Sequence, residues 1–368
     1  MLWLDTRIDP ASILNPGIVM IVDSQIGRLC ISCRGSIKEA LARINATTHL
    51  VQVVVDETNR IQGIVTDGDI RRALVSGAGL DSPVSECMQR SPVTARSAED
   101  AIAILPDMGG RHPCVPVVDE SGHFLSLVSE SNETPGLETA VVMAGGFGKR
   151  LGDKTKSTPK PLIEVGGRPI LWHILKDLQE HGVKRIFVSV HYLAEQICEF
   201  VDAVGLNVKI DILREETPLG TAGALSLIPE DVEGPLLIMN GDIVTRANFA
   251  ALMIHHQLNQ RDATIGAARY DQEVPFGVLE IDSNGNVSEI KEKPRYEHYI
   301  SAGIYAIQPS IYRSLNKREH IDMPDLLRRS ILNKQSVGLF PIHEYWLDLG
   351  RPNDLKLAES QSDSWMNK

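Results

Sequence analysis

A glycine-rich segment with two basic residues is the strongest sign of chemistry in this sequence. It reads Ala144-Gly-Gly-Phe-Gly-Lys-Arg-Leu-Gly152 and follows an apolar run. Small residues let backbone N–H groups approach phosphate oxygens, and Lys149 and Arg150 add positive charge. The spacing differs from the dinucleotide fingerprint G-x-G-x-x-G, and Gly-Lys is followed by Arg rather than by the Ser or Thr of a P-loop. For the loop taken alone, a tight strand-to-helix connection is the alternative interpretation.

A lysine between two prolines follows the loop. In Ser157-Thr-Pro-Lys-Pro-Leu162, the proline rings restrict the backbone around Lys160, so its ammonium group is held at little further entropic cost. From Lys149 to Arg168 there are six basic residues against two acidic ones. In a chain of net charge -11, this local excess of positive charge favours a triphosphate ligand.

Further short motifs follow in order along the chain. They read Glu215-Glu-Thr-Pro-Leu-Gly-Thr-Ala-Gly223, Asn240-Gly-Asp242, Phe276-Gly-Val278, Glu292-Lys-Pro294, Ser301-Ala-Gly303 and Trp346-Leu-Asp-Leu-Gly350. Together with the glycine loop and the Pro-Lys-Pro segment, they resemble the signature of the sugar-1-phosphate nucleotidyltransferases, also called nucleotide-sugar pyrophosphorylases. The resemblance covers nearly everything from Thr139 to Lys356. One departure is Lys149, where many members of the family carry Thr.

The resemblance implies a phosphoryl-transfer reaction. An oxygen of a sugar 1-phosphate attacks the α-phosphorus of a nucleoside triphosphate in line, and pyrophosphate leaves, so the protein's task is positioning and charge stabilisation. Asp242 follows the apolar run Leu236–Met239, and ligands of open α/β sheets gather where strands end. By resemblance, Asp242 and Asp348 bind Mg²⁺, which prefers such oxygen ligands.

The resemblance also assigns roles to other residues. Arg150 would hold the β- and γ-phosphates, Lys160 would stabilise charge on the α-phosphate and Lys293 would hold the sugar phosphate; with Asp242 they form the expected catalytic set. The expected nucleotide-binding residues are Ala144, Gly145, Gly146, Gly148, Arg150, Lys160, Glu215, Gly220 and Thr221. The expected sugar-phosphate-binding residues are Asn240, Gly277, Glu292, Lys293 and Gly303.

The base that binds is suggested by Glu215. The residue five positions before the glycine corresponding to Gly220 often contacts the base edge in this family. A carboxylate only accepts hydrogen bonds, so it can pair with the N1–H and N2–H₂ donors of guanine, whereas uracil or thymine would be better served by an amide. We therefore expect a preference for GTP.

Apolar runs alternate with helical patterns after residue 138, which is typical of βαβ units around a mostly parallel sheet. A helix is expected after Pro169, where five apolar residues recur at helical spacing, and Gly182 is placed to end it. Phe276–Ile281 and Val287–Lys291 flank an Asn-Gly turn signal, which predicts an antiparallel hairpin. The expected strands are Ala140–Ala144, Arg185–Val190, Val208–Leu213, Leu236–Met239 and Ala263–Ala268.

The first 130 residues contain a weak duplication of a helix, a strand, a turn and a strand. The segment Gly63 to Leu74 resembles the end of a CBS motif, and residues 97 to 132 would be its partner. By resemblance, Thr66 and Asp69 would bind a nucleotide, whereas the second copy has Asn132 in the place of the Asp. A purely structural dimerisation module is the alternative.

The predicted fold is therefore α/β, with a Rossmann-like, mostly parallel nucleotidyltransferase sheet that carries an antiparallel insertion and follows a smaller α/β CBS pair. The expected domains are residues 1–130 for the CBS pair, serving regulation or dimerisation, residues 131–137 for a linker and residues 138–368 for catalysis. We expect a homodimer or a higher homo-oligomer.

Composition excludes several other classes of protein. Both halves of the chain are acidic, which opposes binding to nucleic acid. No apolar run is long enough to span a membrane, and the N-terminal residues lack the pattern of a signal peptide. The five cysteines form no zinc-binding pattern. We expect a cytoplasmic protein without a membrane partner.

The predicted function is Mg²⁺-dependent transfer of a nucleoside monophosphate, with GTP and glucosamine 1-phosphate as the favoured substrates. The joining of a CBS pair to this domain is similar to guanylyltransferases of bacterial legionaminic acid biosynthesis. One alternative keeps the reaction but uses mannose, heptose or glucose 1-phosphate with GTP, UTP or dTTP. Another is a catalytically silent protein that senses nucleotides.

Overall fold

The computed structural model describes residues 20–46, 50–108, 114–130, 137–152, 154–362 and 365. The chain divides into two units, Met1–Pro135 and Gly136–Lys368. Among the described residues, no helix combines the length and the apolar character that crossing a bilayer requires.

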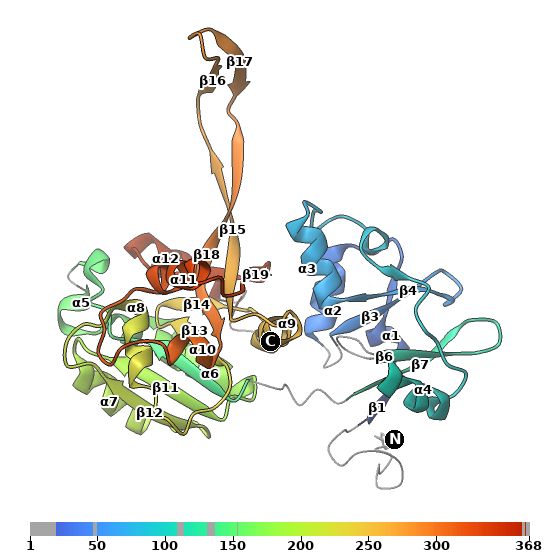
Figure 1. The fold of residues 1–368 in the computed structure, drawn as a ribbon, viewed down its shortest axis with the longest axis horizontal. Helices are drawn as coiled ribbons and strands as arrows, with labels where there is room; N and C mark the ends of the chain where they lie inside the picture. Colours follow the sequence, from blue (N-terminus) through green and yellow to red (C-terminus); the bar gives the residue numbers. More distant parts are fainter. Residues whose placement is uncertain are drawn as a thin grey trace. The chain divides into compact units, whose positions relative to one another are not determined.

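The first unit contains two small sheets, with strand orders β2-β3-β4-β5 and β1-β7-β6 (Figure 1). The strands β3 and β6 are buried along their whole length, as their continuous apolar sequences predict. The strands are β1 (Met20–Asp23), β2 (Cys30–Ser32), β3 (Val51–Val55), β4 (Ile61–Thr66), β5 (Gln89–Arg90), β6 (Cys114–Val118) and β7 (Phe124–Glu130). The helices are α1 (Ile26–Leu29), α2 (Ile37–Asn45), α3 (Asp67–Val75) and α4 (Ala98–Ile104), with 3₁₀ turns η1 (Val84–Glu86) and η2 (Leu105–Asp107).

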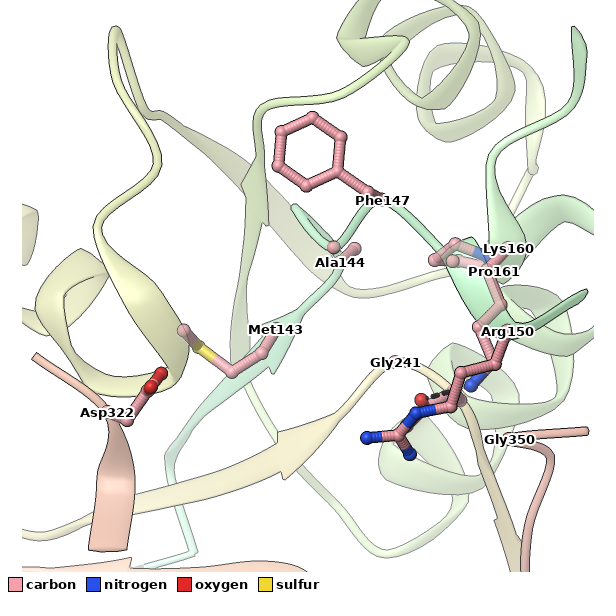
Figure 2. A pocket seen from close by; sticks show the side chains of 12 residues that line it. Met143, Ala144, Phe147, Arg150, Lys160, Pro161, Gly241, Asp322 and Gly350 are labelled. Atoms are coloured by element: carbon pink, nitrogen blue, oxygen red, sulfur yellow. Dashed lines mark hydrogen bonds and ion pairs between the residues drawn. The ribbon is translucent and has the colours of Figure 1, made fainter. Parts of the chain in front are cut away.

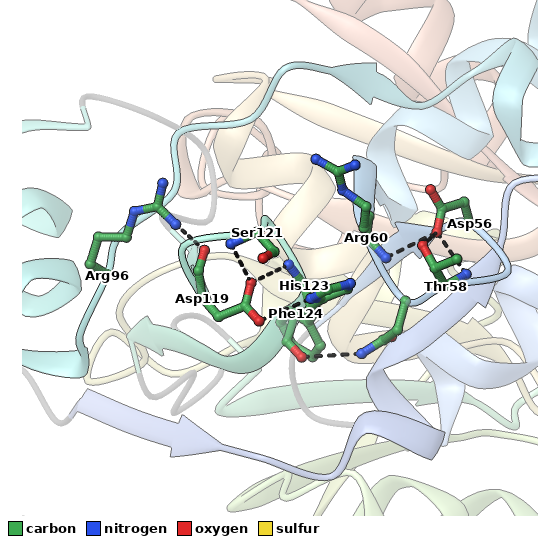
Figure 3. Close-up of polar contacts among 9 residues, drawn as sticks. Asp56, Thr58, Arg60, Arg96, Asp119, Ser121, His123 and Phe124 are labelled. Atoms are coloured by element: carbon green, nitrogen blue, oxygen red, sulfur yellow. Dashed lines mark hydrogen bonds and ion pairs between the residues drawn. The ribbon is translucent and has the colours of Figure 1, made fainter.

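The turns of β3–β4 and β6–β7 have the same geometry, which confirms the predicted duplication (Figure 3). Asp56 Oδ1 accepts hydrogen bonds from the backbone N–H groups two and four residues later, at 2.9 and 3.0 Å. Asp119 Oδ1 does the same, at 2.9 and 2.8 Å. The two turns also bond to each other, because the N–H of Phe124 donates to the carbonyl of Asn59 at 3.0 Å. These Asx turns join the two repeats.

The second unit is built on a seven-stranded sheet of order β12-β11-β8-β13-β18-β15-β19 (Figure 1). Its first four strands are parallel and β18 is antiparallel to both of its neighbours, so the predicted mostly parallel sheet is confirmed. Its strands are β8 (Thr139–Met143), β11 (Arg185–Val190), β12 (Lys209–Arg214), β13 (Leu236–Asn240), β15 (Ala263–Glu273), β18 (Arg295–Ile307) and β19 (Val337–Ile342). The short strands are β9 (Glu164–Val165), β10 (Arg168–Pro169), β14 (Ile243–Thr245), β16 (Gly277–Ile281), β17 (Val287–Glu292) and β20 (Trp346–Asp348).

Helices connect these strands, and α6 (Ile170–Glu180) shows why they form. Pro169 is its N-cap, all five of its periodic apolar residues are buried, and Gly182 follows its end with φ of +83°. The predicted helix is therefore confirmed. The other helices are α5 (Lys154–Ser157), α7 (Ala194–Ala203), α8 (Gly220–Gly223), α9 (Phe249–Leu258), α10 (Pro309–Tyr312), α11 (Met323–Leu332) and α12 (Pro352–Ser360), with 3₁₀ turns η3 (Lys149–Leu151), η4 (Lys160–Leu162) and η5 (Ala224–Leu227).

A two-stranded arm projects from the sheet of this unit, formed by β15 and β18 and ending in β16 and β17 (Figure 1). β15 pairs with β18 from Ala263 opposite Ile307 to Glu273 opposite Arg295. No residue from 269 to 301 is buried. The predicted hairpin is confirmed, but it lies at the end of this arm rather than against the sheet.

A buried ion pair in α3 gives a test of the first unit. Arg71 Nε donates to Asp67 Oδ2 at 2.8 Å, with both side chains almost fully buried. Removing one partner leaves an uncompensated buried charge, so we expect Arg71→Ala to lower the free energy of unfolding of this unit by about 3 kcal/mol in chemical denaturation. Arg72→Ala is the matched control, because the exposed Arg72–Asp69 pair should contribute at most about 1 kcal/mol. Equal losses in the two variants would contradict this assignment.

Candidate active site

The glycine-rich loop follows β8 and is held by a buried threonine. Gly148 has φ of +63°, and a Cβ atom there would lie 2.8 Å from Thr155 Cγ2. The Thr155 hydroxyl bonds to the carbonyl oxygens of Gly148 and Gly152 at 3.0 and 3.1 Å. Thr155 is 4% exposed. The sequence motifs do not identify this residue, because a threonine inside a basic loop carries no distinctive signal.

Lys160 points toward two carboxylates. It begins η4 after Pro159, and its side chain is only 12% exposed. Its Nζ forms an ion pair with Asp242 and lies 3.9 Å from Asp348 Oδ1. The structure therefore brings Lys160 and the two predicted metal ligands to one place.

Two backbone features hold Asp242 beside Asp348, although they are distant in the sequence. β14 pairs with β20 so that Ile243 lies opposite Asp348, and the N–H of Leu349 donates to the carbonyl of Asp242 at 2.9 Å. Gly241 N–H donates to the carbonyl of Met143 at 2.9 Å, where a Cβ atom would not fit. The ends of β13 and β8 are thereby joined beside the carboxylates.

The carboxylates fit a hard divalent cation. Asp242 Oδ1 is buried and has no hydrogen-bond partner among the residues that the structure describes. Burial and then the Asp242 carboxylate raise the pKa of Asp348, as expected for like charges held together. Within the described ranges, no cluster of three or more His, Cys, Asp or Glu side chains could hold a metal. A Mg²⁺ ion here would therefore take its other ligands from phosphate and water, as Mg²⁺ commonly does in proteins.

A cavity of about 710 Å³ is lined by residues of the glycine loop, by Lys160 and by Asp242 (Figure 2). This volume suits a nucleotide-sized ligand. Arg150 and Lys160 both lie on its wall, and so do Phe147 and Asp322, to which no sequence motif assigned a role. The lining residues are Met143, Ala144, Gly146, Phe147, Gly148, Arg150, Lys160, Pro161, Gly241, Asp242, Asp322 and Gly350.

Glu215 lies next to the glycine-rich loop, but its carboxylate already accepts hydrogen bonds from other residues of the protein. A Cβ atom at Gly145 would be 3.0 Å from Glu215 Oε1, so the two residues are neighbours. Oε1 accepts a hydrogen bond from the Ser189 hydroxyl, and Oε2 accepts one from the N–H of Leu219 at 2.8 Å. The side chain is therefore not the free acceptor expected from the sequence, although each oxygen keeps a second lone pair.

Thr221, which follows Gly220, contacts the cavity-lining residue Asp322. Asp322 Oδ1 accepts hydrogen bonds from the N–H and the hydroxyl of Thr221 at 2.9 and 3.2 Å. Gly220 has φ of +79°, and a Cβ atom there would lie 2.6 Å from the carbonyl oxygen of Ile321. The glycine thus permits a close approach that places Thr221 against Asp322.

The predicted sugar-binding residues fall into two groups. Asn240 and Gly303 are neighbours, because a Cβ atom at Gly303 would lie 2.6 Å from Asn240 Nδ2. Gly277, Glu292 and Lys293 lie instead on the arm, where Gly277 pairs with Glu292 at the base of the β16–β17 hairpin.

The structure therefore does not bring all five residues together within a single chain. From Arg295 to Gly303 the strand β18 runs eight residues, about 26 Å at an ordinary strand rise. Pairing with β15 extends the arm away from the sheet. Sequence motifs give the order of these residues but not the direction of the connecting strand.

The residues expected to bind a CBS nucleotide bond to each other. Thr66 is the N-cap of α3, and Thr66 and Asp69 form a capping box in which each side chain accepts from the other's backbone N–H. The Asp69 carboxylate also pairs with Arg72. Asn132, the expected counterpart in the second repeat, lies outside the described residues.

Comparison with known families identifies both units. A family model described as nucleotidyl transferase matches residues 139–364, and a CBS domain model matches residues 29–76 and 84–132. Because the first match covers more than half of the chain, the protein belongs to the nucleotidyl transferase family.

Two curated relatives each match more than half of this chain. Mannose-1-phosphate guanylyltransferase catalytic subunit beta of Drosophila pseudoobscura pseudoobscura is 31% identical over 240 residues, which cover 62% of this chain and 63% of the relative. Bifunctional protein GlmU of Methanococcus maripaludis is 31% identical over 230 residues, covering 60% and 53%. The chain thus spans less than two thirds of these relatives. HddC from Yersinia pseudotuberculosis complexed with GMP-PN has 25% identity and a TM-score of 0.49, covering 61% of this chain and 99% of that chain.

The charge arrangement predicts how metal binding responds to substitution. Lys160 occupies the space beside the carboxylates that a cation would use. Lys160→Met should therefore tighten Mn²⁺ binding without nucleotide by roughly tenfold, since it removes a nearby positive charge, whereas Asp242→Asn should weaken it. Isothermal titration with Mn²⁺ measures both effects, and Lys184→Met, which removes an exposed lysine paired with Glu138, is the control. Weaker binding to Lys160→Met would refute this arrangement.

Proposed function

We propose that this chain transfers a nucleoside monophosphate from a nucleoside triphosphate to a sugar 1-phosphate and releases pyrophosphate. The observation that carries the proposal is the cavity lined by Arg150, Lys160 and Asp242, with Asp348 Oδ1 3.9 Å from the Lys160 ammonium nitrogen. Two cationic and two anionic groups suit a reaction in which anionic substrates must meet and a metal must bind. Membership of the nucleotidyl transferase family supports the same reaction class.

The residues would divide the work by charge. A sugar-phosphate oxygen forms a bond to the α-phosphorus while the bond from that phosphorus to the β-phosphate oxygen breaks. Arg150 would hold the departing β- and γ-phosphates, and Lys160 would stabilise charge at the α-phosphate. Backbone N–H groups from Ala144 to Gly148 would bind further phosphate oxygens. Mg²⁺ held by Asp242 and Asp348 would supply further charge neutralisation.

The donor is proposed to be GTP. The second lone pairs of the Glu215 carboxylate would accept from guanine, with Gly220 and Thr221 against the base. The mannose-1-phosphate guanylyltransferases among the relatives support a guanine nucleotide.

For the acceptor we propose glucosamine 1-phosphate. The pairing of this domain with a CBS pair supports it, as in guanylyltransferases of legionaminic acid biosynthesis. The names of the relatives favour mannose 1-phosphate as the second candidate. Asn240 and Gly303 would bind the sugar, and Glu292 and Lys293, which lie on the arm, would complete the pocket where an arm reaches it.

For the N-terminal unit we propose regulation or dimerisation in a homodimer or a higher homo-oligomer. The capping box at Thr66 and Asp69 would have to open for these side chains to bind a regulatory nucleotide. A catalytically silent nucleotide sensor remains the alternative from another class, and activity distinguishes it.

Pyrophosphate release tests the reaction. Purified protein with Mg²⁺ is assayed with five nucleoside triphosphates against glucosamine, mannose and glucose 1-phosphates. We expect GTP with glucosamine 1-phosphate to be the most productive pair and Asp242→Ala to reduce the rate at least a hundredfold, because a metal ligand is lost. If no pair of substrates releases pyrophosphate while GTP still binds, the nucleotide-sensor alternative is favoured.

Glu215 tests the choice of base. Glu215→Gln keeps one acceptor oxygen and replaces the other by a donor, so we expect the GTP/UTP ratio of kcat/KM to fall roughly tenfold, equivalent to about 1.4 kcal/mol. Glu216→Gln is the matched control, because this neighbouring carboxylate is exposed and pairs with Arg318. If both substrates lose rate equally, Glu215 serves only to hold Ser189 and Leu219.

A further inference from the structure

The arm exposes apolar side chains along much of its length. Phe276 is 71% exposed and Ile290 is 66% exposed. A two-stranded ribbon is marginally stable alone, and exposed apolar patches of this kind mark interaction surfaces. The other large apolar side chains exposed on the arm are Tyr270, Leu279, Ile281, Val287, Tyr296 and Tyr299.

Lys293 differs from every other cation of the arm. Arg269 pairs with Glu297, Lys291 with Glu280 and Arg295 with Glu273, whereas no ion pair involves Lys293 within the described arm. Lys293 is exposed, and its φ of +46° is unusual for a residue with a side chain. Its positive charge is therefore available to an anion or a carboxylate outside the arm.

The remaining parts of the proposed site lie on the sheet, beyond the reach of this lysine in the same chain. Asn240 and Gly303 lie near Asp242, about 26 Å along β18 from the start of the strand at Arg295. The nucleotidyl transferase match at residues 139–364 includes both the sheet and the arm, so both belong to one functional unit. The cavity holds Arg150 and Lys160, which are assigned to the triphosphate, but not the lysine expected to hold the sugar phosphate, whereas the arm carries that lysine without an ion pair.

We propose that two copies of this chain exchange arms, so that Lys293 of each copy completes the cavity of the other. This inference rests on the proposed function and specifies how its sugar-phosphate subsite is assembled. The partner's surface beside its cavity would cover Phe276 and Ile290, and Lys293 would bind the sugar phosphate near the partner's Asp242. A closed twofold exchange gives each cavity one arm and leaves neither arm exposed.

Complementation between variants tests the exchange. Lys293→Ala and Asp242→Ala should each be nearly inactive alone, because every cavity lacks one group. When the two are co-produced, half of the dimers are mixed and each mixed dimer has one intact site, so about a quarter of wild-type activity should return. Co-produced Lys160→Ala and Asp242→Ala, both on the sheet side, should stay inactive. If the co-produced Lys293→Ala and Asp242→Ala variants show no activity while the wild-type protein is active, the proposal is overturned.

Cross-linking tests the exchange without relying on activity, so its failure is distinguishable from failure of the proposed function. Isotopically heavy and light wild-type chains are co-produced in equal amounts and treated with a lysine cross-linker. We expect links between Lys293 and Lys160 that join heavy to light peptides, and their loss when Phe276→Ser is combined with Ile290→Ser. Links confined to peptides of one isotope, or an absence of Lys293 to Lys160 links, would overturn the exchange. Lys291→Ala, which removes an ion-paired cation of the same arm, should leave the mixed links intact.

Discussion

The site depends on two carboxylates held together beside one ammonium group. Asp242 and Asp348 repel each other, which helps to raise the pKa of Asp348, and Lys160 offsets part of this repulsion. Such a cluster is poorly satisfied without a further cation, because Asp242 Oδ1 is buried without a partner among the described residues. The arrangement is therefore prepared for a metal ion bound together with phosphate oxygens, and the cavity beside it has room for a nucleotide.

Backbone geometry rather than side-chain packing brings these charges together. The parallel strands β8 and β13 end side by side, and Gly241 allows the turn after β13 to touch the end of β8. β14 and β20 then place Asp348 next to Asp242. On the other side, Gly148 needs its left-handed conformation to pack against Thr155. Substitutions at these glycines would move the charges even though glycine itself takes no part in the chemistry.

Much of the fold followed from local sequence signals, since strand runs, the helix after Pro169 and the Asn-Gly hairpin depend on neighbouring residues. The group around Lys160 and Asp242 was predictable because both residues belong to family motifs, and Asp242 also follows the strand β13. The hydrogen bonds that Glu215 accepts within the protein, and the one that Asp322 accepts from Thr221, were not predictable, because they depend on how distant segments pack. The direction of the arm was also hidden, since alternating residues in a strand do not say whether it folds back or extends.

The most direct test of the account follows the α-phosphorus of GTP. The protein is incubated with Mg²⁺, a sugar 1-phosphate and GTP radiolabelled at that atom, and the products are separated. If the cavity positions the sugar phosphate for attack on the α-phosphorus, the label moves into a nucleotide sugar with wild-type protein and remains in GTP with Asp242→Asn. Label recovered in GDP would show cleavage at the γ-phosphate, and label unchanged with every sugar phosphate would show a protein that binds nucleotides without transferring them. Either result would contradict the proposed chemistry.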